Sequence, residues 1–275
     1  MLDTHKELDQ DILTRYLGVL GVSRKPPRFD ALKELVLAQM LRAPFENVSK
    51  LYYRKRMGLC DIPDIQTYLN GIEQYHFGGT CYSNNYYFYL LLTSLGYAVK
   101  LCGADMNSPD AHLALMVLVD GRDYLIDVGY AAPFLSPLPR DLTEDYMVVL
   151  GRDRYVLKPQ DADGRSRLEL YRDGKLKHCY LVKPIPKRIE DFSIADSFRA
   201  DATFMNALLL VRFYPDYSLA IHNLTVIESF GTTSRRYGLN RRDELGQVVE
   251  GHFGIPQDIV MEAVNELPQF IDAWN

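Results

Sequence analysis

Hydrophobic positions in the first third of the chain recur with the spacing of α-helices. Two such segments are separated by the helix-breaking pair Pro26-Pro27. A third segment begins after Gly78-Gly79-Thr80 and ends at Gly96, a favourable residue for a helix C-terminus. The apolar positions that define the three patterns are Leu8, Ile12, Leu13, Tyr16 and Leu17; Leu32, Leu35, Val36 and Met40; and Tyr82, Tyr86, Tyr89, Leu90 and Thr93. We therefore predict that residues 1–98 are helical.

From about residue 98 the pattern changes to short segments typical of β-strands. Turn signals separate several of them at Asp120-Gly121, Asp163-Gly164 and Asp173-Gly174. The expected strands cover residues 98–102, 112–119, 123–128, 147–150, 155–158, 167–171 and 176–182. Hairpins at this density indicate a small antiparallel barrel or sandwich over residues 99–196.

The last part of the chain, residues 197–275, has a mixed pattern. Strands are expected over residues 207–213 and 219–226, around a turn at Tyr214-Pro215-Asp216. Helical patterns follow over residues 242–252 and 257–270. The chain therefore divides into three regions of about equal size.

Composition narrows the class of protein. A net charge of -5 argues against non-specific nucleic-acid binding, which depends on a basic surface. The apolar runs are too short to span a membrane, and the first residues lack a signal-peptide pattern. The four cysteines are far apart and form no Cys-X-X-Cys motif. We expect a cytoplasmic protein with reduced cysteines and no metal site.

Cys81 is the best candidate for a nucleophile. Gly78 and Gly79 allow a tight turn, and Thr80 suits the N-cap position of the helix that follows. Cys81 then lies in the first turn, where free N–H groups and the helix dipole stabilise a thiolate. Free cysteines are also common packing residues, so the local sequence leaves both interpretations open.

The hairpin at Asp120-Gly121 predicts a pairing between two polar residues. If Val119 faces Arg122, then His112 and Asp127 lie on one face of the sheet as diagonal neighbours, about 7–8 Å apart at Cα. An imidazole and a carboxylate can meet over that distance. A buried polar pair without chemistry is one interpretation.

Together with Cys81, this pair gives the order Cys-His-Asp, in which the carboxylate orients the imidazole and the imidazole takes the thiol proton. Among the other histidines, His5 and His76 are expected at the surface. His178, His222 and His252 have no recognisable partner in the sequence.

Four motifs in this order resemble the arylamine N-acetyltransferase family. They are Pro44-Phe45-Glu46-Asn47, Gly78-Gly79-Thr80-Cys81, His112 with the apolar strand behind it, and Asp127-Val128-Gly129-Tyr130. Weaker similarity extends through Phe204-Met205-Asn206 and Ile221-His222-Asn223 to Phe253-Gly254-Ile255. The resemblance implies an α+β fold with an N-terminal helical bundle (1–98), a central antiparallel β-barrel (99–196) and a C-terminal α/β lid (197–275). The catalytic core would resemble that of cysteine proteases and transglutaminases.

The resemblance also implies a ping-pong transfer of an acetyl group, as in xenobiotic metabolism. Cys81 would attack acetyl-CoA, with His112 as general base and Asp127 orienting His112. The acetyl group would pass to an arylamine, arylhydrazine or N-hydroxyarylamine, in a pocket lined by Phe45, Tyr130 and Phe134. The implied partners are these small molecules and the CoA thioester, with no metal, nucleic acid or membrane. The implied assembly is a monomer or a weak homo-oligomer.

Three positions depart from the family pattern. Phe77 replaces an arginine that is expected to pair with Glu46, so Glu46 needs another partner, for which Arg42 is a candidate. Ser83 replaces a Glu or Gln that would complete a capping box, and Tyr130 replaces a Phe. The three residues of the triad are retained, but these departures leave the preferred acceptor and the catalytic efficiency undetermined.

Other functions remain compatible with the same residues. A cysteine enzyme acting on peptide amides would use the same triad but would need an open cleft. An amide synthase would close an amide on a tethered acyl chain without CoA. A non-catalytic relative would bind CoA or a small aromatic compound without turnover.

Overall fold

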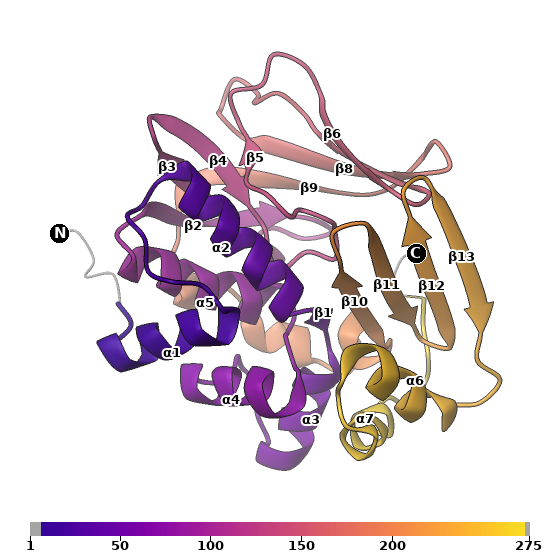
Figure 1. Ribbon diagram of the computed structural model, residues 1–275. Coiled ribbons are helices and arrows are strands. Elements are labelled where there is room, and N and C mark those ends of the chain that lie inside the picture. The colour runs from indigo at the N-terminus through magenta and orange to yellow at the C-terminus, as the bar shows by residue number, and fades with distance from the viewer. Residues whose placement is uncertain (1–6, 273–275) are drawn as a thin grey trace.

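The computed structural model describes residues 7–272, and its first part is helical as predicted (Figure 1). Asp9 and Asp64 begin two of the helices, each accepting a hydrogen bond from a first-turn N–H. Thr80 occupies the N-cap position of α5, but its side chain makes no capping hydrogen bond. The helices are α1 (Gln10–Leu20), α2 (Phe29–Arg42), α3 (Val48–Met57), α4 (Ile65–Tyr75) and α5 (Cys81–Ser94).

The central part of the chain forms an eight-stranded antiparallel sheet that curls into a barrel-like shape (Figure 1). Every strand expected between residues 98 and 182 is present, with ends shifted by up to four residues. In spatial order the strands are β5 (Leu138–Pro139), β4 (Arg122–Ile126), β3 (His112–Val119), β2 (Ala98–Asp105), β9 (Lys175–Pro186), β8 (Ser166–Arg172), β7 (Asp153–Leu157) and β6 (Tyr146–Leu150).

Asp-Gly pairs close two of the hairpins of this sheet. Asp120 and Gly121 have φ values of 49° and 77°, and Asp173 and Gly174 have 53° and 75°. Positive φ at both central residues is the geometry of a type I′ turn, which matches the twist of the flanking strands. These turns therefore fix the register, and Val119 faces Arg122 as predicted.

The C-terminal part forms a second antiparallel sheet that is covered by two helices. Its order is β1 (Phe45–Glu46), β10 (Leu209–Phe213), β11 (Tyr217–His222), β12 (Thr225–Phe230) and β13 (Thr233–Gly238), and the helices are α6 (Glu244–Phe253) and α7 (Gln257–Val264). Short 3-10 helices η1 (Ile189–Asp191), η2 (Ile194–Phe198) and η3 (Thr203–Met205) connect the two sheets. The predicted α+β fold of bundle, barrel and α/β lid is confirmed.

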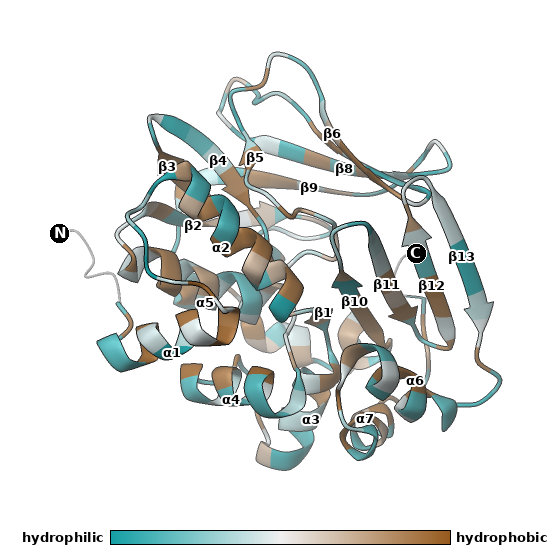
Figure 2. Ribbon diagram, viewed as in Figure 1, coloured by the Kyte–Doolittle hydropathy of each residue, from teal (hydrophilic) through white to brown (hydrophobic). Residues whose placement is uncertain are grey.

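Two expectations for this region are wrong. A single strand over residues 219–226 does not form, because the chain turns at Asn223, which has a φ of 53° and tolerates the left-handed conformation. The helix expected over residues 257–270 ends at Val264, because Pro268 disfavours helix in the residues before it. Strand β13 was not expected, since it is mostly exposed and polar (Figure 2).

The hydrophobic cores bridge the three regions of the chain. One cluster joins the helices to β2, β3 and β10, a second packs α3, α6 and α7 against the second sheet, and a third fills the barrel. Strand β10 contributes to two of these clusters. Its residues Leu209 and Val211 belong to the first cluster, whereas Leu210 and the preceding residue Leu208 belong to the second. The division into domains 1–98, 99–196 and 197–275 remains a prediction. None of the helices within residues 7–272 has the length and hydrophobicity needed to cross a bilayer.

Gly78 should be intolerant of any side chain. A Cβ there would lie 1.9 Å from the carbonyl oxygen of Pro44 and 2.7 Å from its nitrogen, so the backbone must move. We expect Gly78→Ala to lower the free energy of unfolding by about 1–3 kcal/mol, measured by urea denaturation.

Gly18→Ala is the matched control, because a Cβ at Gly18 in α1 would have no heavy atom within 4 Å. This control should gain up to about 1 kcal/mol from helix propensity. Equal stabilities for the two variants would show that the contact between Gly78 and Pro44 is not constrained.

Candidate active site

Cys81 is the first residue of α5 and is partly exposed. The loop before it is fixed by the segment around Phe45, since Gly79 donates to Pro44 O and Glu46 donates to Gly79 O. On its other side, Gly129 packs so closely that a Cβ there would lie 2.6 Å from Cα of Cys81. Two of the motifs that are distant in sequence are therefore neighbours of Cys81.

His112 and Asp127 meet as the hairpin register predicted. His112 begins β3, Asp127 follows the end of β4, and the pairing of Leu115 with Ile126 continues the expected register. His112 Nε2 and Asp127 Oδ2 are 2.7 Å apart, and both side chains are buried. Nε2 is thus occupied by the carboxylate, which leaves Nδ1 as the ring nitrogen available to Cys81.

The Asp127 carboxylate has further donors, two of which the sequence did not reveal. Tyr180 OH donates to Oδ2 at 2.9 Å, and Asn85 Nδ2 donates to Oδ1 at 2.8 Å. The backbone N–H of Gly129 donates to Oδ1 at 3.2 Å. Asn85 lies four residues after Cys81 on the same helix, a spacing that could have suggested a shared face. Tyr180 on β9 gives no such local signal.

Opposing effects act on the imidazole. Burial alone lowers the pKa of His112, but the charges of Asp127 and Cys81 and their hydrogen bonds outweigh burial and raise the pKa to about 10. The imidazolium is therefore the stable form at neutral pH. A protonated imidazole beside a sulfur favours the thiolate, which is the reactive form of cysteine.

Of the three predicted pocket residues, Tyr130 and Phe134 form one aromatic cluster next to His112, and Phe45 does not belong to it. The Tyr130 ring is edge-on to His112 with centroids 5.8 Å apart, and it stacks on Phe134 at 6.2 Å. Phe45 lies apart from them in β1 and packs against Phe204. The Tyr130 hydroxyl pairs with Nδ1 of His178 at 2.8 Å, so His178 has the partner that the sequence did not show.

Among the remaining histidines, His76 is exposed, as expected, and His5 lies outside the described residues. Nε2 of His222 lies 3.7 Å from a carboxylate oxygen of Asp272, so it too has a partner that was not foreseen.

Glu46 is fully buried and is held by backbone donors. Gly78 N donates to Oε1 at 3.1 Å and Ser49 N donates to Oε2 at 2.8 Å, whereas Arg42 forms no ion pair with it in the described part of the chain. Phe77, which replaces the expected arginine, packs among the rings of Tyr52, Tyr53 and Tyr75. Burial raises the pKa of Glu46, and these hydrogen bonds oppose the shift only in part.

The chain resembles known proteins over most of its length. A family model described as N-acetyltransferase matches residues 28–260. Arylamine N-acetyltransferase 1 of Homo sapiens is 24% identical over 212 residues, which cover 66% of this chain and 70% of that protein. This chain belongs to the arylamine N-acetyltransferase family. The protein is therefore an acetyl-CoA-dependent acyltransferase.

Two further comparisons describe its place in the family. The structure of the Mycobacterium marinum arylamine N-acetyltransferase in complex with CoA has a TM-score of 0.74 at 20% identity, over 93% of this chain and 99% of that one. Proansamycin X synthase of Amycolatopsis mediterranei (strain S699) is 29% identical over 117 residues, or 40% of this chain and 44% of that protein. The first shows the shared fold. Within residues 7–272, no group of three His, Cys, Asp or Glu side chains is placed to hold a metal ion.

Removing the Asp127 charge should reverse the pKa shift of His112. In Asp127→Asn, burial still lowers the pKa of His112 while the raising effects of the carboxylate are gone, so we expect the pKa to fall from about 10 toward its ordinary value of about 6.5. NMR titration of the imidazole measures this directly. His76→Gln, at an exposed site, is the control and should leave the His112 titration unchanged.

The same shift makes stability depend on pH. The folded state binds the His112 proton more tightly than the unfolded state, so the stabilisation is complete below pH 6.5 and disappears as the pH rises to about 10. Asp127→Asn should lack this decline in urea unfolding. A variant whose His112 titrates as in the wild type would contradict the assigned role of the carboxylate.

Glu46→Gln should destabilise the fold although it is nearly isosteric. Two backbone N–H groups point at this side chain, and an amide offers only one oxygen, so we expect a loss of about 1–3 kcal/mol in urea unfolding. Because the pKa of Glu46 is raised by burial, the wild type should lose stability as the pH rises above 4.5, and the variant should lack this loss. Glu34→Gln, in an exposed ion pair with Lys25, is the control. Equal losses in both variants would contradict the prediction.

Proposed function

We propose that this enzyme transfers an acetyl group from acetyl-CoA to an arylamine, arylhydrazine or N-hydroxyarylamine through an acetyl-Cys81 intermediate. The observation that carries the proposal is the buried His112–Asp127 pair, whose remaining ring nitrogen is available to Cys81 at the start of α5. The arrangement has the order and roles of a cysteine triad.

The first half-reaction forms the acetyl-enzyme. His112 takes the thiol proton of Cys81, and the thiolate attacks the thioester carbonyl of acetyl-CoA. The bond between the carbonyl carbon and the CoA sulfur breaks, and CoA leaves as a thiol with the proton from His112. The raised pKa of His112 suits this role because the imidazole retains the proton until the leaving group needs it.

The second half-reaction consumes the intermediate. The nitrogen or oxygen of the acceptor attacks the acetyl-cysteine carbonyl, the bond to the Cys81 sulfur breaks, and His112 takes the proton that the acceptor loses. The Tyr130 ring lies beside His112, Phe134 stacks on Tyr130, and Phe45 lies next to the loop that holds Cys81. We assign these three residues to the acyl and acceptor pocket, since aromatic rings stack favourably on aromatic amines.

Other finer assignments follow from the same proposal. Cys60, Cys81, Cys102 and Cys179 are all free thiols, which supports a reducing cytoplasmic location. We propose small-molecule partners only, and a monomer or weak homo-oligomer. Three arginines of the C-terminal region do not form one site for the phosphates of CoA: Arg235 and Arg236 point to opposite faces of the exposed strand β13, and Arg242 stacks on Phe270.

A second candidate function is that of an amide synthase, which would close an amide on a tethered acyl chain without CoA. The observation behind this alternative is the partial match to a protein named as a synthase, Proansamycin X synthase. Both reactions use an acyl-cysteine, so they differ in the donor and not in the triad. Only the acetyltransferase releases CoA from acetyl-CoA when an aromatic amine is added.

Mass spectrometry of the intact protein tests the proposal. After brief incubation with acetyl-CoA, the wild type should gain one acetyl group and lose it when an aromatic hydrazine is added. Cys81→Ala should not be labelled, and its turnover should fall by at least about a thousandfold. Cys179→Ala, at another partly exposed thiol, is the matched control and should behave as the wild type.

The alternatives give different results in the same experiment. An unmodified wild type that also releases no CoA with any acyl-CoA donor would overturn the acetyltransferase proposal. In that case a tethered acyl chain, a peptide amide or non-catalytic binding would become the leading function. Labelling that persists in Cys81→Ala would overturn the assignment of the nucleophile.

A further inference from the structure

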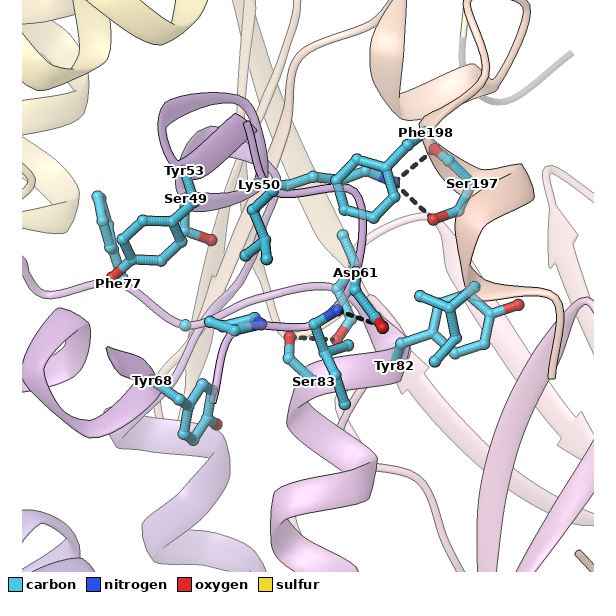
Figure 3. Close-up of a pocket in the computed structure, with 16 residues that line it drawn as sticks. Ser49, Lys50, Tyr53, Asp61, Tyr68, Phe77, Tyr82, Ser83, Ser197 and Phe198 are labelled. Atoms are coloured by element: carbon cyan, nitrogen blue, oxygen red, sulfur yellow. Dashed lines mark hydrogen bonds between the residues drawn. The ribbon is translucent and has the colours of Figure 1, made fainter. Parts of the chain in front are cut away.

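A pocket lies beside the start of α5 (Figure 3). Gly78, Thr80, Tyr82 and Ser83 border it, whereas Cys81, His112 and Asp127 do not line it. The rest of the lining comes from α3, from the loop between α3 and α4, and from η2. The pocket is therefore separate from the triad, although the same helical turn forms a wall of both.

Lys50 of α3 carries the positive charge of this pocket. Its side chain crosses the pocket toward η2, where Nζ donates to the backbone oxygen of Ser197 at 2.5 Å and to Oγ of Ser197 at 2.9 Å (Figure 3). The ammonium also lies 4.1 Å from the centre of the Phe198 ring. All three partners are neutral, and within residues 7–272 Lys50 forms no ion pair with a carboxylate.

A desolvated ammonium without a counter-ion is unfavourable, and an anion that enters the pocket relieves it. Burial lowers the pKa of Lys50 to about 8, while the nearby sulfur of Cys81 acts in the opposite direction. Arg54 and Cys60 act on Lys50 more weakly. Asp61, which also borders the pocket, is exposed and accepts a hydrogen bond from Ile62 N, so water screens its charge.

The other residues that line the pocket determine the remaining chemical features of the ligand. Phe77, Ile62, Ile194 and Phe198 present apolar surface, and the space between them is small. The hydroxyl groups of Tyr53 and Tyr68 are bonded to Thr67 O and Asn84 Oδ1. The occupant therefore needs one negative charge and an apolar tail of few carbon atoms. A compact, strongly hydrated phosphate fits these walls less well.

We propose that this pocket binds a small monocarboxylate through Lys50, and that the bound anion decreases the reactivity of Cys81 from behind the first turn of α5. The second effect follows because the Lys50 charge stabilises a thiolate at Cys81, and a carboxylate neutralises that charge. Binding itself is independent of the catalytic role proposed for Cys81.

Butyrate is a suitable probe, with butyramide as its uncharged isostere. Protein NMR should show saturable shifts of the Gly78, Thr80 and Ser83 amides with butyrate, and at least about tenfold weaker binding of butyramide. Lys50→Met should abolish binding, Lys50→Arg should retain it, and Cys81→Ser should leave it unchanged. Lys55→Met removes a cation at the exposed end of the same helix, where Lys55 pairs with Glu266, and should bind as the wild type does.

The pH dependence and the coupling to Cys81 complete the test. Affinity should be constant between about pH 6 and about pH 8, where butyrate is ionised and Lys50 is protonated, and should fall about tenfold per unit above that range, as Lys50 loses its proton. Saturating butyrate should slow alkylation of Cys81 at neutral pH at least about threefold in the wild type and not in Lys50→Met.

Several results would overturn the proposal. They are the absence of saturable binding, binding that survives Lys50→Met, and equal affinity for butyramide or inorganic phosphate. If butyrate also slows alkylation of Cys81 in Lys50→Met, relative to the same variant without butyrate, the butyrate lies in the catalytic pocket instead. Unchanged alkylation in the butyrate-bound wild type would remove the proposed effect on Cys81. Because binding is also measured in Cys81→Ser, the binding results do not depend on whether Cys81 is the nucleophile.

Discussion

The buried carboxylate of Asp127 connects the helical part of the enzyme to its barrel. A buried charge is tolerated only when hydrogen bonds replace the water it has lost, and Asp127 obtains them from four directions. They come from His112 on β3, Asn85 on α5, Tyr180 on β9 and the N–H of Gly129. The helix that begins with Cys81 is thereby held against the histidine strand. The position of the sulfur relative to the imidazole is thus a consequence of satisfying one carboxylate.

Asn85 has a second role in this arrangement. Its side-chain oxygen accepts from Val128 N at 2.9 Å, and its amide donates to Leu113 O at 2.8 Å as well as to Asp127. One amide therefore bonds the segments that follow His112 and Asp127 to the helix of Cys81. Gly129 packs against Cα of Cys81 and also holds these segments together, since no larger residue fits there. A change at Asn85 or Gly129 would alter the geometry between Cys81 and His112 without touching either.

The sequence alone predicted the elements whose determinants are local. Asp120-Gly121 fixes a type I′ turn, the turn fixes the register, and the register brings His112 to Asp127. Tyr180 was not predictable in this way, because its contact with Asp127 depends on β9 pairing with β2 across a long connection. Strand β13 is paired on only one side and largely exposed, so it has no hydrophobic alternation to reveal it. The neutral partners of Lys50 come from η2, which lies about 150 residues further along the chain.

Phe77 stands where the family resemblance predicts an arginine, so an apolar ring and not a cation borders the pocket beside Cys81 at this position. Glu46 at the end of β1 and Lys50 in the first turn of α3 are four residues apart, yet each bonds to neutral groups and not to the other. Burial shifts the pKa of both groups toward the uncharged form, up for the glutamate and down for the lysine. Lys50 keeps its charge at neutral pH, so it is a cation on that side of Cys81 that an anionic ligand can neutralise.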